Sequence, residues 1–399
     1  AQETLRNLPE VMALTAGQAR TLTLGSPLTL SRQAGNVAVS ASEDETLREK
    51  GAVALVSETA GSSELLLSIL GVVPLRKVEV QVSEEKRLIP GGMAIGVALH
   101  TDGVLVVGLS DLSGGQGESP ARVSGIKAGD VIRRVDGVDI ASADQLSRLI
   151  AQAGERALPV EFARNGETLQ ATMTPRLDAS TGTARMGAWV RDSTAGVGTL
   201  SFYDPDTGRY GALGHAITDG DTGKVLTVGH GQILRAQVVA VQKGVKGTPG
   251  ELKGSFLREG LVLGNIRRND PLGIYGQMED APVQPLYPDG LPIGLRSGVH
   301  TGAAQILSSI DGHGVQAFDV EITRVTPQSA PAPKSMVLRV TDPRLLDKTG
   351  GIVQGMSGSP IIQDGRLIGA VTRVFVGDPT QGYGLYIDWM LEQSAQSAA

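Results

Sequence analysis

The chain has 399 residues, of which 41% are hydrophobic and 20% charged, a balance typical of a globular protein. Its length predicts two or three domains. The formal net charge of -6 gives no basic surface for nucleic acid, which is therefore not expected as a partner. The absence of cysteine excludes disulfides, thiolate nucleophiles and cysteine-ligated metals.

Short runs of alternating apolar and polar residues, such as Thr21–Leu24 and Val78–Val82, occur in the first 87 residues. This period of two is typical of strands with one buried face. We expect a small N-terminal β domain, residues 1–87, without catalytic side chains. The chain begins at Ala1 rather than methionine, and we expect a signal or anchor segment to precede it in the native protein.

Residues 88–176 combine strands with one helix. Strand-like runs at 95–99 and 104–107 flank an Asp-Gly turn. Residues 142–145 form a capping box before an amphipathic helix, and an Asn-Gly turn at 165–166 predicts a closing hairpin. Residues 175–187 are small, polar and turn-rich, so we expect a linker there.

The third segment, residues 177–399, predicts a barrel or sandwich, because short strand candidates recur between turn signals without long helices. A closing helix is expected over 386–397. The whole chain is therefore predicted to be mainly β. The strand candidates are Gly198–Tyr203, Val225–Val228, Gln237–Val241, Ile361–Ile362 and Leu367–Val376.

The strongest chemical signal is the run Gly-Met-Ser-Gly-Ser-Pro at residues 355–360. Small residues around a serine allow a tight turn that can direct backbone N–H groups into one pocket. The amides of Gly355 and Ser357 could stabilise an oxyanion, and losing one such donor typically costs about 2.7 to 4 kcal/mol. Ser359 is the weaker nucleophile candidate, and the spacing differs from that of a nucleophile elbow.

A serine nucleophile needs a base, usually histidine. His215 lies among small residues after a strand-like run, and His230 lies between two glycines. The local sequence leaves both open. The remaining histidines are His100, His300 and His313.

A carboxylate is expected to orient the base. Asp342, at the end of an apolar run, is one candidate, although Asp-Pro also forms turns. No His-Glu-x-x-His or comparable ligand cluster is present, so neither a metal nor another cofactor is expected. The other candidate carboxylates are Asp219, Asp221, Asp311 and Asp319.

Three segments, residues 211–217, 340–343 and 351–361, closely resemble the SpoIVB peptidase family. The resemblance implies a chymotrypsin-like double β-barrel over 177–399. It also implies His215 as base rather than His230, Asp342 as orienting carboxylate and Ser357 as nucleophile. Asp342 lies only 15 residues before Ser357, whereas chymotrypsin-like enzymes place this residue between the two barrels.

Residues 88–176 resemble a bacterial PDZ domain, a module that binds an extended peptide as an added strand. The resemblance places the loop that caps a peptide carboxylate at Gly91, Gly92, Met93, Ala94 and Ile95.

The family resemblance further implies a sporulation signalling protease that acts on protein substrates. It implies export to the space between the forespore and mother-cell membranes, an N-terminal anchor absent here, and cleavage of itself. Its other implied target is a membrane-bound regulator of an intramembrane metalloprotease, whose cleavage triggers processing of a sigma-factor precursor.

Two rival functions remain open. The first is a non-catalytic scaffold in which the PDZ module binds partners. The second is a serine esterase with a different leaving group, although a peptide-binding module favours peptide substrates.

Overall fold

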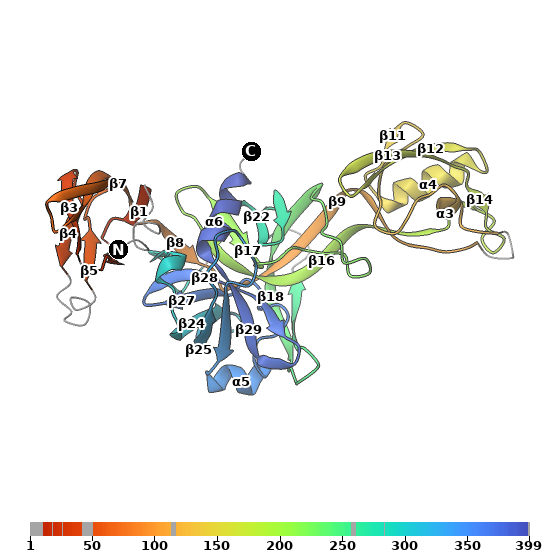
Figure 1. Ribbon diagram of the computed structural model, residues 1–399. Coiled ribbons are helices and arrows are strands. Elements are labelled where there is room, and N and C mark those ends of the chain that lie inside the picture. The colour runs from red at the N-terminus through yellow and green to blue at the C-terminus, as the bar shows by residue number, and fades with distance from the viewer. Residues whose placement is uncertain are drawn as a thin grey trace. The chain divides into compact units, whose positions relative to one another are not determined.

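The structure is a computed structural model of the chain, and strands dominate it, so the prediction of a mainly β protein is confirmed. The chain divides into two compact units, Ala1–Arg87 and Leu88–Ala399 (Figure 1). The described residues are 11–17, 19–25, 27–41, 51–112, 117–256, 261–282 and 284–397.

The first unit holds two small sheets. One has the order β1-β7-β6-β3, with β1 parallel to β7, and the other has the order β2-β5-β4. Leu65 and Leu67 on β6 and Val78 and Val80 on β7 are buried, as alternation predicts. The strands are β1 (Val11–Thr15), β2 (Arg20–Thr23), β3 (Leu28–Ala34), β4 (Ala38–Ala41), β5 (Ala52–Val56), β6 (Gly61–Ile69) and β7 (Val73–Ser83).

The predicted PDZ segment has its own core under helix α4 (Ala143–Ala153). The Ser142 side chain caps α4 by accepting a hydrogen bond from the Gln145 N–H, and Gly154 ends it, as the sequence predicts. Asn165 and Gly166 both have positive φ in the turn between β12 and β13. The other elements are β9 (Ala94–Leu109), α3 (Pro120–Val123), β10 (Val131–Val135), β11 (Val138–Asp139), β12 (Leu158–Arg164) and β13 (Glu167–Met173).

The prediction of a linker at residues 175–187 is wrong. Strands β14 (Arg176–Leu177) and β15 (Ala184–Arg185) pair as a hairpin, and α4 packs against β15. Met186 is buried in the core beneath α4. The two strands are only two residues long, so no periodicity marked them in the sequence.

The first half of the predicted peptidase segment is organised around β16 (Ala188–Tyr203), which pairs with β9 over most of its length. The sheet then continues in the order β16-β17-β22-β21, and β18 pairs with the other edge of β9. A strand predicted over 225–228 is wrong, because Val225 forms only an isolated bridge with Thr218. The other strands are β8 (Arg87–Pro90), β17 (Arg209–Ala212), β18 (His230–Gln242), β19 (Glu251–Phe256), β20 (Val262–Asn265), β21 (Arg268–Asp270), β22 (Gly273–Gln277) and β23 (Leu291–Pro292).

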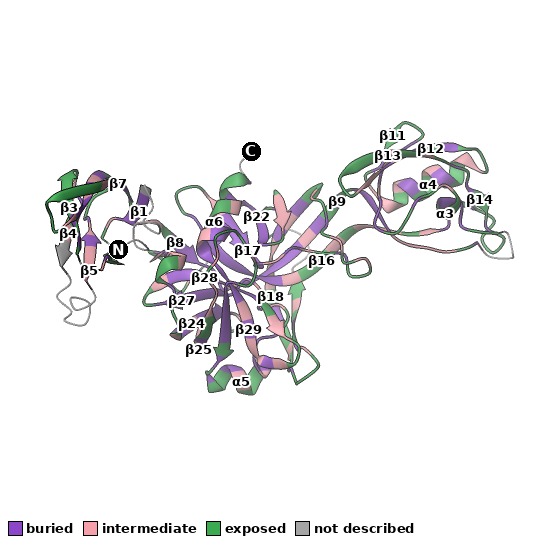
Figure 2. Cartoon of the chain, in the orientation of Figure 1, coloured by how far each residue is buried: buried purple, intermediate pink, exposed green. Residues whose placement is uncertain are grey.

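The second half is a closed barrel with the order β24-β25-β26-β29-β28-β27. Its strands are largely buried and enclose the largest core of the molecule (Figure 2). The predicted closing helix is confirmed as α6 (Ile387–Gln396). No helix in the described part of the chain has the length and apolar character needed to cross a membrane. The other elements are η2 (Arg296–Gly298), β24 (Gly302–Ser308), β25 (Gln316–Val325), β26 (Met336–Val340), α5 (Pro343–Thr349), β27 (Pro360–Gln363), β28 (Arg366–Phe375) and β29 (Asp378–Tyr386).

Candidate active site

Ser357 lies on a tight loop that precedes β27. Gly355 and Gly358 both have positive φ, 95° and 98°, which suits glycine. A side chain at Gly358 would place its Cβ 2.1 Å from the Thr199 carbonyl oxygen, so only glycine fits there. The Ser357 hydroxyl donates a hydrogen bond of 2.7 Å to the Thr372 carbonyl on β28.

Thr199 on β16 holds this loop at two points. Its Oγ1 donates to the Gly355 carbonyl at 2.7 Å, and its N–H donates to the Ser357 carbonyl at 3.1 Å. Thr199 is buried. These two bonds fix the orientation of the peptide groups 355–356 and 357–358, one before Met356 and one after Ser357, and therefore restrain the backbone at the serine.

His215 follows two residues in left-handed conformation, Leu213 and Gly214. Its Nδ1 lies 2.8 Å from the Ala216 carbonyl oxygen. The segment that follows is held by Asn269 of β21, whose amide accepts from the Ile217 N–H and donates to the Ile217 carbonyl. If Nδ1 carries the proton, Nε2 is left as a free acceptor.

His215 and Ser357 line one cavity of about 570 Å³, together with Gly355 and Arg373. Neither the Gly355 N–H nor the Ser357 N–H donates to an acceptor among the described residues. Backbone amides without a protein acceptor beside a serine hydroxyl are the kind of donor that an oxyanion requires.

Burial lowers the pKa of His215, and the positive charge of Arg373 lowers it further, while the bond to the Ala216 carbonyl opposes both. A lowered pKa keeps the imidazole neutral at neutral pH, the form a general base needs. In this structure no hydrogen bond joins His215 to Ser357, whose hydroxyl is bonded to Thr372 instead.

Asp342 is not at this site. It is the N-cap of α5, where its carboxylate accepts hydrogen bonds from the side chain and N–H of Arg344 and from the Asp319 N–H. Arg344 lowers the pKa of Asp342. The carboxylate is buried and does not line the cavity that holds His215. The predicted pairing with His215 is therefore wrong in this structure, and the turn-forming role of Asp-Pro applies instead.

The other candidates lie elsewhere. The Ser359 hydroxyl is buried without a partner among the described residues. His230 is exposed beside His100, with ring centroids 6.4 Å apart. The other candidate side chains have ionic partners of their own. His300 pairs with Asp364, His313 pairs with Asp311, and Asp219 and Asp221 both pair with Arg191. No group of three or more metal-ligating side chains occurs in the described ranges.

The five residues assigned to a PDZ carboxylate loop, Gly91 to Ile95, belong to the peptidase half. The Gly91 and Gly92 amides donate to the carbonyls of Ser201 and Leu200 on β16. Ile95 lies in the core of that half. With both amides used, these residues cannot cap a peptide carboxylate, and that assignment is wrong.

Three residues of the site were not predicted from the sequence: Thr199, Asn269 and Arg373. Each acts across a long sequence separation, 156 residues for the bond between Thr199 and Gly355. No local motif surrounds any of them, so only the fold reveals their roles.

A mainly β fold in which a serine and a histidine line one cavity is the arrangement expected of a serine peptidase. The family model described as SpoIVB peptidase S55 matches residues 182–391, more than half of the chain, and a PDZ domain model matches 113–164. The chain belongs to the SpoIVB peptidase S55 family and carries a PDZ domain.

Other similarities are partial. A "Putative zinc metalloprotease" of Treponema pallidum is 35% identical over 101 residues, 24% of this chain and 21% of that protein, so the chain spans about a fifth of this relative. The Rv3671c protease of M. tuberculosis in its active form is 18% identical, with 52% of this chain and 75% of that chain covered and a TM-score of 0.29. The HtrA-type protease AlgW with decapeptide is 15% identical, with 52% and 54% covered and a TM-score of 0.32. The assignment rests on the family model.

Proposed function

We propose that the protein is a serine endopeptidase in which Ser357 is the nucleophile and His215 the general base. The amides of Gly355 and Ser357 are proposed to bind the oxyanion. The observation that supports this best is that these residues line one cavity, while neither amide donates to an acceptor in the described part of the chain.

In this mechanism the Ser357 hydroxyl first rotates away from the Thr372 carbonyl toward His215. Nε2 takes the hydroxyl proton as Oγ attacks the peptide carbonyl, and the tetrahedral oxygen is held by the two amides. His215 then gives the proton to the leaving amine, which leaves an acyl ester on Ser357. Water hydrolyses this ester by the same proton relay.

The Ala216 carbonyl takes the place that a carboxylate has in a Ser-His-Asp triad. It can hold the Nδ1–H tautomer, as the 2.8 Å contact suggests. A neutral carbonyl stabilises the imidazolium less than a carboxylate does, so we expect a slower proton relay than in enzymes with a full triad.

We also propose, on the strength of family membership alone, that the peptidase acts in sporulation signalling. Its proposed substrates are its own chain and a membrane-bound regulator of an intramembrane metalloprotease, and cleavage of the regulator starts processing of a sigma-factor precursor. The proposed location is the space between forespore and mother-cell membranes, with anchoring through an upstream segment.

The alternative is a PDZ scaffold without catalysis, favoured by one observation: the Ser357 hydroxyl is bonded to Thr372 rather than to His215. Cleavage of a mixed extended-peptide library by the full chain distinguishes the two. Ser357→Ala and His215→Ala are expected to abolish cleavage, whereas the matched controls Ser359→Ala and His230→Ala retain it. Equal cleavage by all four variants, or none by the wild type, would contradict the proposal.

A further inference from the structure

The cavity that holds Ser357 and His215 is lined by charge of one sign. Arg373 of β28 is the cation, and no Asp or Glu occurs among the described residues that line this cavity. Burial lowers the pKa of His215, so its ring is uncharged near neutral pH. The other lining side chains are uncharged. A bound peptide therefore meets one unbalanced positive charge beside the reacting groups.

The guanidinium of Arg373 is available to a ligand. The residue is exposed, and its guanidinium forms no ion pair or hydrogen bond with the described part of the chain. Arg344, in contrast, is paired with the Asp342 carboxylate. The charge of Arg373 also lowers the pKa of His215, so the guanidinium lies within electrostatic reach of the proposed base.

The cleft continues beyond this cavity with charges of both signs. A neighbouring cavity of about 460 Å³ shares Gln354 and Gly355 with the first, so the two form one cleft. Glu251 and Lys253 of β19 line this far part. Because their charges are opposite, the unbalanced charge is confined to the end of the cleft that holds Ser357.

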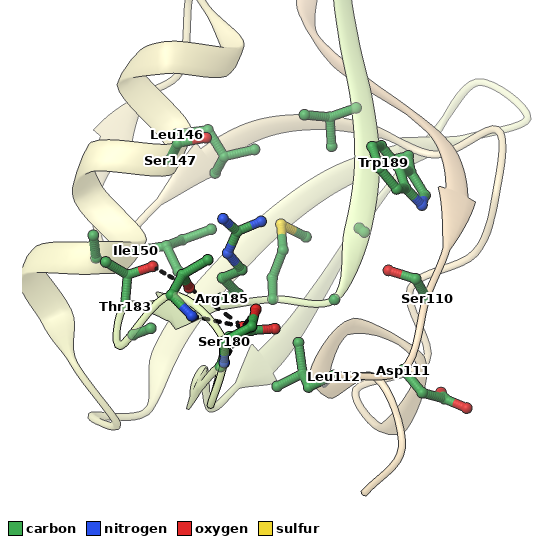
Figure 3. Close-up of a pocket in the computed structure, with 18 of the residues that line it drawn as sticks. Ser110, Asp111, Leu112, Leu146, Ser147, Ile150, Ser180, Thr183, Arg185 and Trp189 are labelled. Atoms are coloured by element: carbon green, nitrogen blue, oxygen red, sulfur yellow. Dashed lines mark hydrogen bonds between the residues drawn. The ribbon is translucent and has the colours of Figure 1, made fainter. Parts of the chain in front are cut away.

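The cavity of the PDZ domain, of about 610 Å³, serves as a comparison. Figure 3 shows Arg185 and Asp111 among its lining residues, together with the apolar Leu146 and Ile150 of α4. Its charged lining residues are thus of both signs. An excess of one sign is therefore a property of the Ser357 cavity and not of every cleft in this protein.

Covering Arg373 with a substrate determines which side chain fits beside it. A peptide that fills the cavity removes water from the guanidinium, and a cation without a counter-ion in such a place is costly. A substrate carboxylate offsets this cost, because Asp and Glu can accept two parallel hydrogen bonds from an arginine. An amide or apolar side chain leaves the cation without a charged partner, and a lysine is repelled by it.

We propose that Arg373 is a specificity-determining residue and that the peptidase selects substrates with Asp or Glu at one position close to the scissile bond. The substrate carboxylate pairs with Arg373 while the peptide carbonyl lies at Ser357. This inference rests on the proposed function and names the substrate class of the same site.

Matched peptides test this preference. A peptide that the full chain cleaves in the mixed library is resynthesised with Glu, Gln or Lys at each position on either side of the scissile bond. At one of these positions the wild-type kcat/KM for Glu is expected to exceed that for Gln at least about tenfold, since a site with an unpaired polar group rejects the analogue that cannot pair with it. The Lys peptide is expected to be the poorest substrate.

A charge reversal assigns the preference to one side chain. Arg373→Glu is expected to make the Lys peptide a better substrate than the Gln peptide. The ratio within a pair of peptides is the quantity measured, because both peptides meet the same His215 and a change in its pKa cancels. Arg267→Ala removes an exposed arginine outside the cavity and is the matched control, expected to keep the wild-type ratio.

Two results separate this inference from the proposed function. Equal cleavage of the Glu and Gln peptides at every position, or the same preference in Arg373→Glu as in the wild type, would overturn the inference and leave the proposed function standing. Absence of cleavage of every peptide, together with absence of fluorophosphonate labelling of Ser357, would contradict the proposed function and the inference with it.

Discussion

Burial, and to a smaller extent the charge of Arg373, disfavour a second proton on His215 and lower its pKa, against the opposing effect of the Ala216 carbonyl. The neutral base is therefore available at pH values below the ordinary histidine pKa of about 6.5. Arg373→Ala removes the positive charge and allows the pKa of His215 to rise. The acid limb of the pH profile for labelling of Ser357 by a fluorophosphonate is therefore expected to move to higher pH. Arg373→Lys keeps the charge and is expected to keep the wild-type limb. Labelling measured between about pH 5 and 8 checks this, and a limb that moves to lower pH in Arg373→Ala would contradict it.

Thr199 is a positioning residue rather than a catalytic one. Thr199→Val removes the hydrogen bond to the Gly355 carbonyl at almost unchanged volume, and one such bond contributes about 0.5–1.5 kcal/mol. We expect kcat to fall about tenfold with KM little changed, because the loop that carries the oxyanion donors loses one of its two restraints. Thr199→Ser restores the hydroxyl and is expected to restore kcat. A rise in KM without a fall in kcat would argue against this role.

Helix α5 gives Asp342 a structural role. Asp342→Ala removes the cap and the buried acceptor of Arg344, and is expected to lower the free energy of unfolding by about 1–3 kcal/mol at neutral pH. Because Arg344 holds the pKa of Asp342 below its ordinary value, its stabilisation is present above the unfolded pKa and is lost as pH falls through the folded pKa. The difference in urea unfolding between wild type and variant should therefore shrink in acid.

The same variant separates stability from catalysis. Fluorophosphonate labelling of folded Asp342→Ala is expected to stay within about threefold of wild type, because Asp342 has no contact with His215. A folded variant with normal unfolding and labelling reduced by orders of magnitude would restore the triad assignment and contradict the geometry.

Local signals predicted local elements well. The capping box at Ser142 and the Asn165-Gly166 turn specified α4 and the β12–β13 hairpin, because both depend on neighbouring residues alone. The assignment of Gly91 to Ile95 to the PDZ domain is wrong because β9, which begins at Ala94, first pairs with β18 in the peptidase half and only later, from Val104, with β10 of the PDZ sheet. A hydrophobic run does not reveal which sheet each part of a long strand joins.

At the scale of the whole molecule, the placement of Ser357 and His215 in one cavity could be inferred only through family resemblance. Neither residue lies near the other in the sequence, and the pairs that assemble the site, such as Thr199 with Gly355, join distant strands. Strand β16 connects these parts, since it runs from the PDZ sheet to the cavity of Ser357 and then to Thr199 (Figure 1). Such continuity is a property of the fold and is invisible in composition or spacing.

The most direct test of the central claim is to map the fluorophosphonate adduct on the full chain by tandem mass spectrometry. The account predicts one modified residue, Ser357, with the reaction at least about 100-fold slower in His215→Ala. An adduct on Ser359 or another serine, or a rate that does not depend on His215, would contradict it.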